Sequence, residues 1–300
     1  HSESEMRAKT ASVGVDVDSL RHYYRIHGLD EDAASNAAWE IGVPRFVELF
    51  DAVGIPATFY CIAEDLEYPG NDARMRALVA AGHEIGNHRL NHFYDLTRLD
   101  SAAMQTQVAE SRRQLSEASG TEVVGFRSPG YNTNTELIEQ VFAAGHRYDS
   151  SVFPCAPYYL AKASVMGWLH LRRRPSASIL GSPRVLVAPS EPYRMDAEEP
   201  HKAGSSAHVQ FPIAVAAGVP LIGTAFTALR QSASVAVTEI ALRLRKHLTI
   251  EFHAVDLMSL DDDGLDSRLA VQPDLKVSVA AKRGIFERIL KRVAASTDVV

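Results

Sequence analysis

A repeated pattern of an amphipathic helix, a glycine and a short apolar strand most constrains the fold of this 300-residue chain. The pattern occurs in VELFDAVGIPATFY around Gly54, in RALVAAGHEIG around Gly82 and in EQVFAAGHRYDS around Gly145. Glycine at that place suits the left-handed backbone that ends a helix before the chain turns back. A fourth copy, PIAVAAGVPLIG around Gly218, fits less well because FPIAV itself reads as a strand. We therefore expect helices and strands to alternate along the chain.

Strands that alternate with helices form a mostly parallel sheet, whose active site lies at the carboxyl ends of the strands. The pattern therefore predicts one domain with a barrel or barrel-like α/β fold. We expect residues 1–10 to form an N-terminal tail, and residues 155–207 to be an insertion that departs from the repeat. The predicted strands cover residues 12–17, 57–62, 83–87, 122–127, 208–211 and 248–253.

Composition excludes several classes of protein. With 46% apolar residues the chain can bury a full core, and its net charge of −6 argues against a nucleic-acid partner, which requires a basic excess. Cys61 and Cys155 are too few for a disulfide scaffold and are expected to be buried apolar groups in a reducing compartment. The first ten residues contain no apolar signal-peptide core, so we expect a cytoplasmic protein.

Two carboxylates end the first predicted strand. Asp16 and Asp18, in SVGVDVDS, are two residues apart, and the side-chain period of a strand points both of them the same way. Two carboxylates on one face repel each other at neutral pH unless they share a cation or a proton. A solvated turn is the simpler interpretation of this motif taken alone.

A nearby pair of histidines favours the interpretation that the two carboxylates lie beside a bound cation. His88 and His92 in GHEIGNHRLNH are four residues apart, so a helical turn beginning at Asn87 would place both imidazoles on one face. Two histidines and one aspartate suit Zn²⁺, Co²⁺ or Ni²⁺ with coordination positions left open. The alternatives are two unrelated surface histidines and the iron(II) site of an oxygenase.

Two later segments also carry polar residues at predicted strand ends. Arg127, in GFRSPGYN, could pair with a carboxylate, while Pro129 and Gly130 force an irregular turn that is expected to leave backbone N–H groups free. His253 ends the late strand in IEFHAVDL. A surface salt bridge for Arg127 and a core position for His253 are the simpler interpretations.

The order and content of these motifs resemble the nodulation-factor-type polysaccharide deacetylases, carbohydrate esterase family four. The resemblance spans about residues 12–256 and implies a distorted (β/α) barrel of seven or eight strands. The sequence departs from the family in two places: Val17 separates the two aspartates, and the fourth motif lacks its usual tryptophan. The matching motifs are VDVDS (15–19), HRLNH (88–92), RSPGY (127–131), YDSSVFP (148–154) and EFH (251–253).

The resemblance also implies roles for particular residues. Asp18, His88 and His92 would hold one divalent metal ion, with zinc expected and cobalt or nickel as alternatives. Asp16 would be the general base, paired with and tuned by Arg127. The turn at Pro129 would let the Tyr131 backbone N–H stabilise the oxyanion. His253 would be the general acid, with Asp149 orienting it or adjusting its pKa.

These roles imply a metal-dependent hydrolase that removes an N-acyl group, expected to be acetyl, from an amino sugar of a glycan. One alternative is a deformylase or deacetylase of a lipid-linked sugar. Another is a catalytically degenerate protein that binds glycans without hydrolysing them.

The segment 157–175 bears on the lipid-linked alternative. It is an apolar stretch with Trp168 that ends in Arg172, Arg173 and Arg174. A helix of this composition can lie in a membrane interface with its arginines on anionic headgroups. A buried barrel helix with a basic carboxyl end is the competing interpretation.

Overall fold

Strand β1 (Thr10–Val17) lies inside the main sheet and pairs with three other strands. The structure, a computed structural model, describes residues 9–173 and 178–300. β1 pairs in parallel with β10 on one side and with β2 on the other, and the sheet continues through β3, β4, β5, β7 and β6, while β11 also pairs with β1. The other strands are β2 Thr58–Cys61, β3 Glu84–Asn87, β4 Gly125–Phe126, β5 Tyr148–Asp149, β6 Tyr193–Arg194, β7 Val209–Gln210, β8 Val215–Ala216, β9 Val219–Pro220, β10 His247–His253 and β11 Asp298–Val299.

The segment 211–222, which contains the β8–β9 hairpin, bridges the two ends of this curled sheet. The Ala214 N–H donates to the Thr249 carbonyl on β10, and the Glu251 N–H of the same strand donates to the Leu221 carbonyl. From β10 to β7 the paired strands are parallel, and β6 alone on this path is antiparallel to its neighbour. The predicted fold class, an α/β barrel of the distorted kind, is confirmed as a curled half-barrel.

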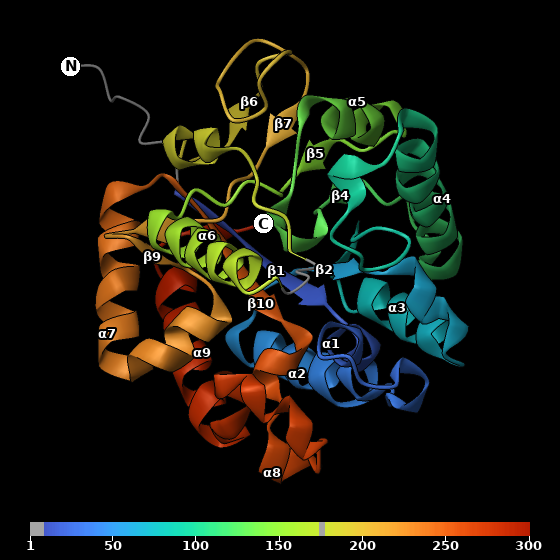
Figure 1. Cartoon of the computed structure of the whole chain (residues 1–300). Helices are drawn as coiled ribbons and strands as arrows, with labels where there is room; N and C mark the ends of the chain where they lie inside the picture. The colour runs from blue at the N-terminus through green and yellow to red at the C-terminus, as the bar shows by residue number, and fades with distance from the viewer. Residues whose placement is uncertain (1–8, 174–177) are drawn as a thin grey trace, which may run out of the picture.

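Helices cover the outer face of the sheet (Figure 1). α2, α7 and α9 pack against the half that contains β1 and β10, while α3, α4 and α5 pack against the half from β3 to β5. The helices are α1 Leu20–Ile26, α2 Val43–Val53, α3 Asn71–Ala80, α4 Ser101–Ser119, α5 Thr135–Ala143, α6 Ala156–Leu171, α7 Gly223–Leu244, α8 Leu260–Asp263 and α9 Val279–Ala294.

The alternation of side chains along β1 separates the core from the barrel interior. Val13, Val15 and Val17 are buried in one apolar cluster with Phe46 of α2 and Phe286 of α9. Because successive side chains of a strand point to opposite faces, the residues between these valines face the interior of the barrel. The predicted common orientation of the two aspartates follows from the same period.

The predicted helix–glycine–strand units form as expected. The three glycines adopt positive φ after their helices, at 77° for Gly54, 89° for Gly82 and 100° for Gly145. The fourth copy does not form a helix, because residues around Gly218 make the turn of the β8–β9 hairpin instead.

The predicted insertion contains α6 and the short strand β6. Helix α6 lies across the front of the molecule in Figure 1, and none of its residues is buried. Residues 1–8 of the predicted tail lie outside the described residues, as do Arg174 and Pro175 of the predicted apolar segment, while Thr10 already belongs to β1. Among the described helices there is none with the length and apolar character needed to cross a bilayer.

Candidate metal centre and active site

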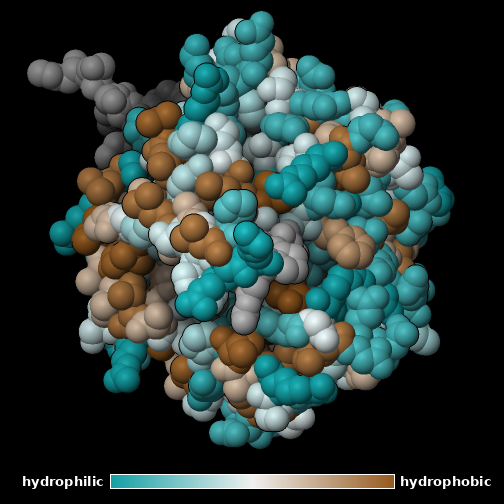
Figure 2. All heavy atoms as spheres, viewed as in Figure 1, coloured by the Kyte–Doolittle hydropathy of each residue, from teal (hydrophilic) through white to brown (hydrophobic). Residues whose placement is uncertain are grey.

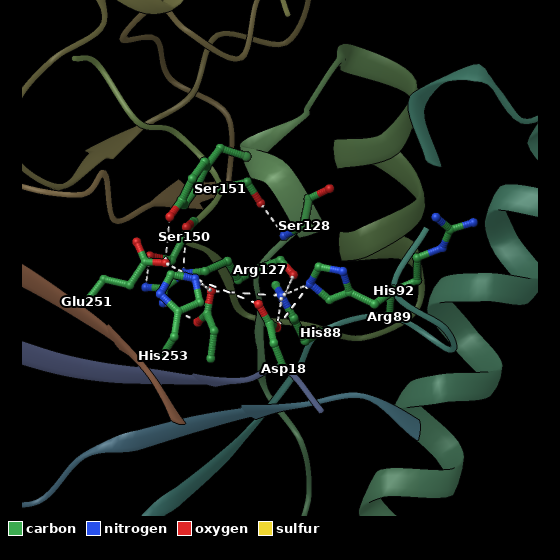
Figure 3. A network of polar contacts seen from close by, with 12 residues as sticks. Asp18, His88, Arg89, His92, Arg127, Ser128, Ser150, Ser151, Glu251 and His253 are labelled. Atoms are coloured by element: carbon green, nitrogen blue, oxygen red, sulfur yellow. Dashed lines mark hydrogen bonds and ion pairs between the residues drawn. The ribbon is translucent and has the colours of Figure 1, made fainter. Parts of the chain in front are cut away.

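Three ligand atoms converge at the carboxyl ends of β1 and β3. The Nε2 atom of His92 lies 3.0 Å from Oδ1 of Asp18, and the Nε2 atom of His88 lies 3.4 Å from the same oxygen. The two Nε2 atoms are 3.1 Å apart. All three side chains are buried, and the Asp18 oxygen has no hydrogen-bond partner. Figure 3 shows His88 and His92 approaching Asp18 from one side.

This arrangement fits a divalent metal ion. Ligands at about 2.0–2.2 Å from one ion lie roughly 3.0–3.6 Å from each other, which is the range of the three distances. The Nδ1 atom of His88 lies 2.6 Å from the Arg127 carbonyl, so it donates there and leaves the Nε2 lone pair free. Burial disfavours the Asp18 carboxylate, but the two imidazoles outweigh it and hold the pKa of Asp18 well below its usual value.

The segment from His88 to His92 is a loop, so the helical turn predicted at Asn87 does not form. Arg89, inside this loop, has a positive φ of 77° and is almost completely buried. Its guanidinium donates to Gln107 of α4 at 2.9 Å and to Asp95 at 2.8 Å. The loop is therefore fastened to α4 by Arg89, which points away from the metal ligands in Figure 3. The histidines meet because of these tertiary contacts, whereas helical spacing plays no part.

Asp16 is held by Arg127, as expected. The Nη1 atom of Arg127 donates to Oδ1 of Asp16 at 2.7 Å, and both side chains are buried. Burial opposes the charged carboxylate, but the ion pair with Arg127 and the nearby His88 and His253 lower the pKa of Asp16 below its ordinary value. The second oxygen, Oδ2, lies 3.8 Å from the His88 ring. Asp16 is therefore a carboxylate beside the candidate metal position.

Room for this guanidinium comes from a glycine on β1, which is separated from β4 by two strands of the sheet. A Cβ atom on Gly14 of β1 would lie 3.0 Å from Arg127 Nη1. The rest of the guanidinium is also occupied, since its Nε donates to the Ser150 carbonyl at 3.0 Å and its Nη2 to Ser150 Oγ at 2.9 Å. Its carbon lies 4.1 Å from the centre of the Tyr60 ring. Arg127 is consequently fixed in one position.

His253 lies on the opposite side of Asp18 from the two histidine ligands (Figure 3). Its Nε2 atom is 3.8 Å from Oδ2 of Asp18 and 3.5 Å from Oε1 of Glu251. Burial disfavours the charged imidazolium of His253. The surrounding carboxyls, of which Glu251 has the largest effect and Asp18 the next, nevertheless raise the pKa of His253 to about 9. The His253 N–H donates to Asp256 Oδ2 at 2.8 Å, and that carboxyl fits because Gly223 of α7 has no side chain there.

Two of the predicted contacts are absent from the described residues. The Tyr131 backbone N–H, expected to be free, donates to the Ser128 carbonyl at 3.1 Å because the residues from Pro129 form a tight 3₁₀ turn. Asp149, expected to orient His253 or adjust its pKa, instead accepts from Ser151 Oγ at 2.6 Å and from Gln210 at 2.5 Å. The carboxyls that raise the pKa of His253 are those of Glu251, Asp18, Asp256 and Asp16. Both expectations are corrected by local hydrogen bonding.

Two residues that sequence reasoning assigned no role belong to the site. Glu251 is completely buried, accepts from the Tyr131 hydroxyl at 2.8 Å, and has its pKa raised to about 8 by burial and by the nearby Asp16. The ring centre of His22 lies 3.5 Å from that of His92. The sequence did contain signals for both: Glu251 is two residues before His253 on the same strand, and His22 follows Asp18 by one helical turn.

The converging residues form the floor of a cavity of about 270 Å³. Asp16, Asp18 and His253 line it from the strand ends, and residues of α1, α6 and the segment 272–275 complete its walls. Buried carboxylates, imidazoles and the candidate metal position meet here in one cavity, a combination typical of active sites.

Comparison with known proteins gives three matches in sequence. Residues 35–148 match the family model described as Polysaccharide deacetylase, a range that includes His88, His92 and Arg127. A peptidoglycan deacetylase of Helicobacter pylori is 25% identical over 154 residues, which is 49% of this chain and 51% of the relative. A peptidoglycan deacetylase-like protein of Gibberella zeae is 28% identical over 50% of this chain and 45% of the relative. The alignments thus span about half the length of these curated relatives.

Two solved structures share the fold over nearly the whole chain. A Mycobacterium smegmatis protein described as a polysaccharide deacetylase has a TM-score of 0.60 at 17% identity and covers 100% of this chain and 88% of that one. The Puue allantoinase has a TM-score of 0.59 at 17% identity and covers 98% of this chain and 87% of that one. At this identity the likeness establishes the curled (β/α) architecture.

Proposed function

We propose that this chain, part of which matches the polysaccharide deacetylase family model, removes an N-acyl group, acetyl in the first instance, from an amino sugar of a glycan. The single observation that carries this proposal is the convergence of Asp18, His88 and His92 beside Asp16 and His253 in one cavity. Hydrolysis of an amide requires an activated water, charge stabilisation and a proton for the departing amine. This site has a residue suited to each task.

Asp18, His88 and His92 would hold one divalent ion, with zinc as the first choice and cobalt or nickel as alternatives. When bound, such an ion polarises the acyl carbonyl and lowers the pKa of water. The chemistry of the donor set supports the assignment, because two imidazole nitrogens lie 3.1 Å apart beside a buried carboxylate oxygen that has no hydrogen-bond partner.

The remaining steps belong to the residues around this position. Asp16, kept charged by Arg127, accepts the proton of the attacking water at Oδ2, the oxygen that Arg127 does not bind. His253, on the other side of Asp18, donates the proton at Nε2 to the amine nitrogen as the C–N bond breaks. Asp256 holds the backbone of His253 in place, and the walls of the cavity orient the sugar. The proposed base oxygen, Asp16 Oδ2, and the proposed acid nitrogen, His253 Nε2, lie 4.0 Å apart beside the candidate metal position.

Metal content and acyl release test this proposal together. The purified chain should contain nearly one equivalent of zinc, cobalt or nickel by elemental mass spectrometry, and it should release acetate from N-acetylglucosamine oligomers. Asp18→Ala should lose both the metal and the acetate release. A chain that takes up no divalent metal would refute the hydrolase mechanism. Glycan binding without acetate release by the metal-loaded chain would instead support the degenerate, binding-only alternative.

We further propose that α6 makes a peripheral membrane contact, which would suit a lipid-linked sugar as substrate. Among its apolar residues Leu160, Val165, Trp168 and Leu171 are 61%, 58%, 50% and 82% exposed. Figure 2 shows hydrophobic residues gathered on the left half of the same face, in the region of α6 and α7. A contiguous exposed apolar surface is uncommon on a protein that contacts water alone. Arg172, stacked 5.2 Å from the Trp168 ring, adds the positive charge that anionic headgroups attract.

A further inference from the structure

Lys162 is a cation on the roof of the active-site cavity. It lies on α6, and it lines both the main cavity and a smaller adjoining one that shares Gly130, Tyr131 and Tyr158 with it. Its side chain is half-buried, whereas Leu160, Val165 and Trp168 of the same helix are exposed. A lysine in the middle of an apolar helix therefore faces the site.

Contacts between α6 and the site fix the direction in which Lys162 points. Tyr158, one turn before it, lies edge-on to the Tyr131 ring with centres 5.9 Å apart and packs on Phe153 at 4.8 Å. Residues four apart on a helix share a face, so Lys162 projects toward the Tyr131 side of the cavity. The Tyr159 hydroxyl donates to the Gly181 carbonyl at 2.9 Å, which further anchors the helix.

Charge in the cavity is divided between its floor and its roof. Asp16, Asp18 and Asp256 lie on the floor, and Asp274 belongs to the wall formed by residues 272–275. Lys162 is the one lysine or arginine among the described residues that line the two cavities. Within residues 9–173 and 178–300 its ammonium forms no hydrogen bond or ion pair. Burial lowers the pKa of its ammonium, since the positive charge loses water without gaining a partner. A half-buried cation left in this state is well placed to bind an anion from solution.

The smaller cavity extends the site beyond the reacting sugar. Its lining includes Thr133, whose hydroxyl is buried and has no hydrogen-bond partner, together with Asn132 and Ser182. Unsatisfied buried polar groups of this kind are costly unless a ligand or water completes them. The roof between the two cavities therefore offers one positive charge and several hydrogen-bonding groups.

We propose that Lys162 binds an anionic oxygen group, a carboxylate or a phosphate, that the substrate carries next to the N-acyl sugar. The inference rests on the proposed deacetylase function and names the substrate class for it: an acidic glycan or a phosphorylated sugar. The ammonium would select that group by charge, while the reaction itself takes place at the floor of the cavity.

The test compares probes that differ in charge. A neutral N-acetylglucosamine tetramer is set against a tetramer in which N-acetylmuramic acid alternates and adds a carboxylate, and against N-acetylglucosamine 1-phosphate. For the anionic probes Lys162→Met should raise KM roughly tenfold with kcat nearly unchanged, and Lys162→Arg should restore most of the loss. For the neutral tetramer both variants should stay within about twofold of the wild type. Whichever anionic probe responds identifies the carboxylate or the phosphate as the group bound.

Controls separate this inference from the proposed function. Lys291→Met removes a distant exposed charge and should leave every KM unchanged. Equal changes for neutral and anionic probes, or no change for any of them, would overturn the role of Lys162. Binding of the probes to metal-loaded His253→Ala, with and without Lys162→Met, gives a readout that does not depend on turnover. The inference is refuted if His253→Ala binds anionic and neutral probes alike, or if adding Lys162→Met leaves its preference for the anionic probes unchanged, whereas absence of acetate release from the wild type refutes the proposed function.

Discussion

The guanidinium of Arg127 donates to the Asp16 carboxylate at 2.7 Å, inside the barrel and out of contact with solvent. Removing one partner of a buried ion pair leaves an uncompensated charge, which costs about 3–5 kcal/mol. We expect Arg127→Met to lower the free energy of unfolding by that amount and to lower kcat/KM for acetate release by at least about 100-fold.

The measurements for Arg127 are urea unfolding and steady-state kinetics on the same preparations. Arg127→Lys should recover part of the stability and little of the activity, because an ammonium cannot bond Asp16 and both Ser150 acceptors at once. Arg147, whose side chain is 70% exposed, provides the control, and Arg147→Met should be close to wild type. Wild-type kcat/KM in Arg127→Met would show that the pair has no part in catalysis.

Substitution of His253 and substitution of a metal ligand should affect metal content and turnover differently. His253→Ala is expected to retain the metal, since the converging ligand atoms belong to other residues, and to lower kcat by roughly 10²–10⁴-fold. Metal content by elemental mass spectrometry and acetate release by an enzymatic assay measure the two properties. His208→Ala, which alters an imidazole outside the cavity, is the matched control. Hydrolysis by His253→Ala at the wild-type rate would contradict the acid role.

Asp65 should make stability depend on pH. Burial raises its pKa to about 7 from an unfolded value of 3.8, even though Trp39 donates a hydrogen bond to it. The folded state therefore binds this proton more tightly, so the stabilisation is complete below pH 4 and is lost as the pH rises through 7. Asp65→Asn removes the charge and keeps an acceptor for Trp39. We expect it to raise the free energy of unfolding at pH 8 by about 2–4 kcal/mol.

Urea unfolding at pH 4, 6 and 8 checks this expectation, and the difference between Asp65→Asn and wild type should shrink toward pH 4. Asp72→Asn, at an exposed position paired with Arg76, should show no comparable change. A difference that does not vary with pH would mean that Asp65 ionises alike in the folded and unfolded chains.

The outer face of α6 should bind anionic membranes. A variant with Trp168→Ser, Arg172→Ser and Arg173→Ser loses the aromatic ring and two positive charges, so its sedimentation with phosphatidylserine-containing vesicles should fall at least severalfold. Acetate release from a soluble substrate should stay within about twofold. Vesicles of neutral lipid alone serve as the control surface. The membrane proposal fails if the wild type stays in the supernatant when the vesicles are sedimented. If the protein alone is then a dimer by analytical ultracentrifugation, the apolar face of α6 covers a second copy of the chain.

Local sequence determined the parts of this protein that depend on neighbours along the chain. Period-two alternation places Asp16 and Asp18 on one side of β1, and glycines with positive φ follow three helices as expected. The order of helices and strands likewise predicts a parallel, curled sheet with its site at the strand ends. These features follow from backbone geometry, which a few consecutive residues are enough to specify.

Tertiary structure decided which groups meet and which are already satisfied. His88 and His92 converge because buried Arg89 fastens their loop to α4, and Arg127 reaches Asp16 across more than a hundred residues. The Tyr131 N–H and the Asp149 carboxylate found local partners, so their expected contacts did not form.

The charges of the site are likewise a tertiary property. Glu251 and His253 have raised pKa values because folding buries them beside Asp16 and Asp18, and Lys162 faces the cavity because Tyr158 docks α6 on Tyr131. Ionisation and orientation depend on burial and on distant neighbours, whereas a motif specifies residue types and their spacing. The sequence by itself therefore predicted the candidate chemistry, and the packing of the folded chain decided which residues are in a position to perform it.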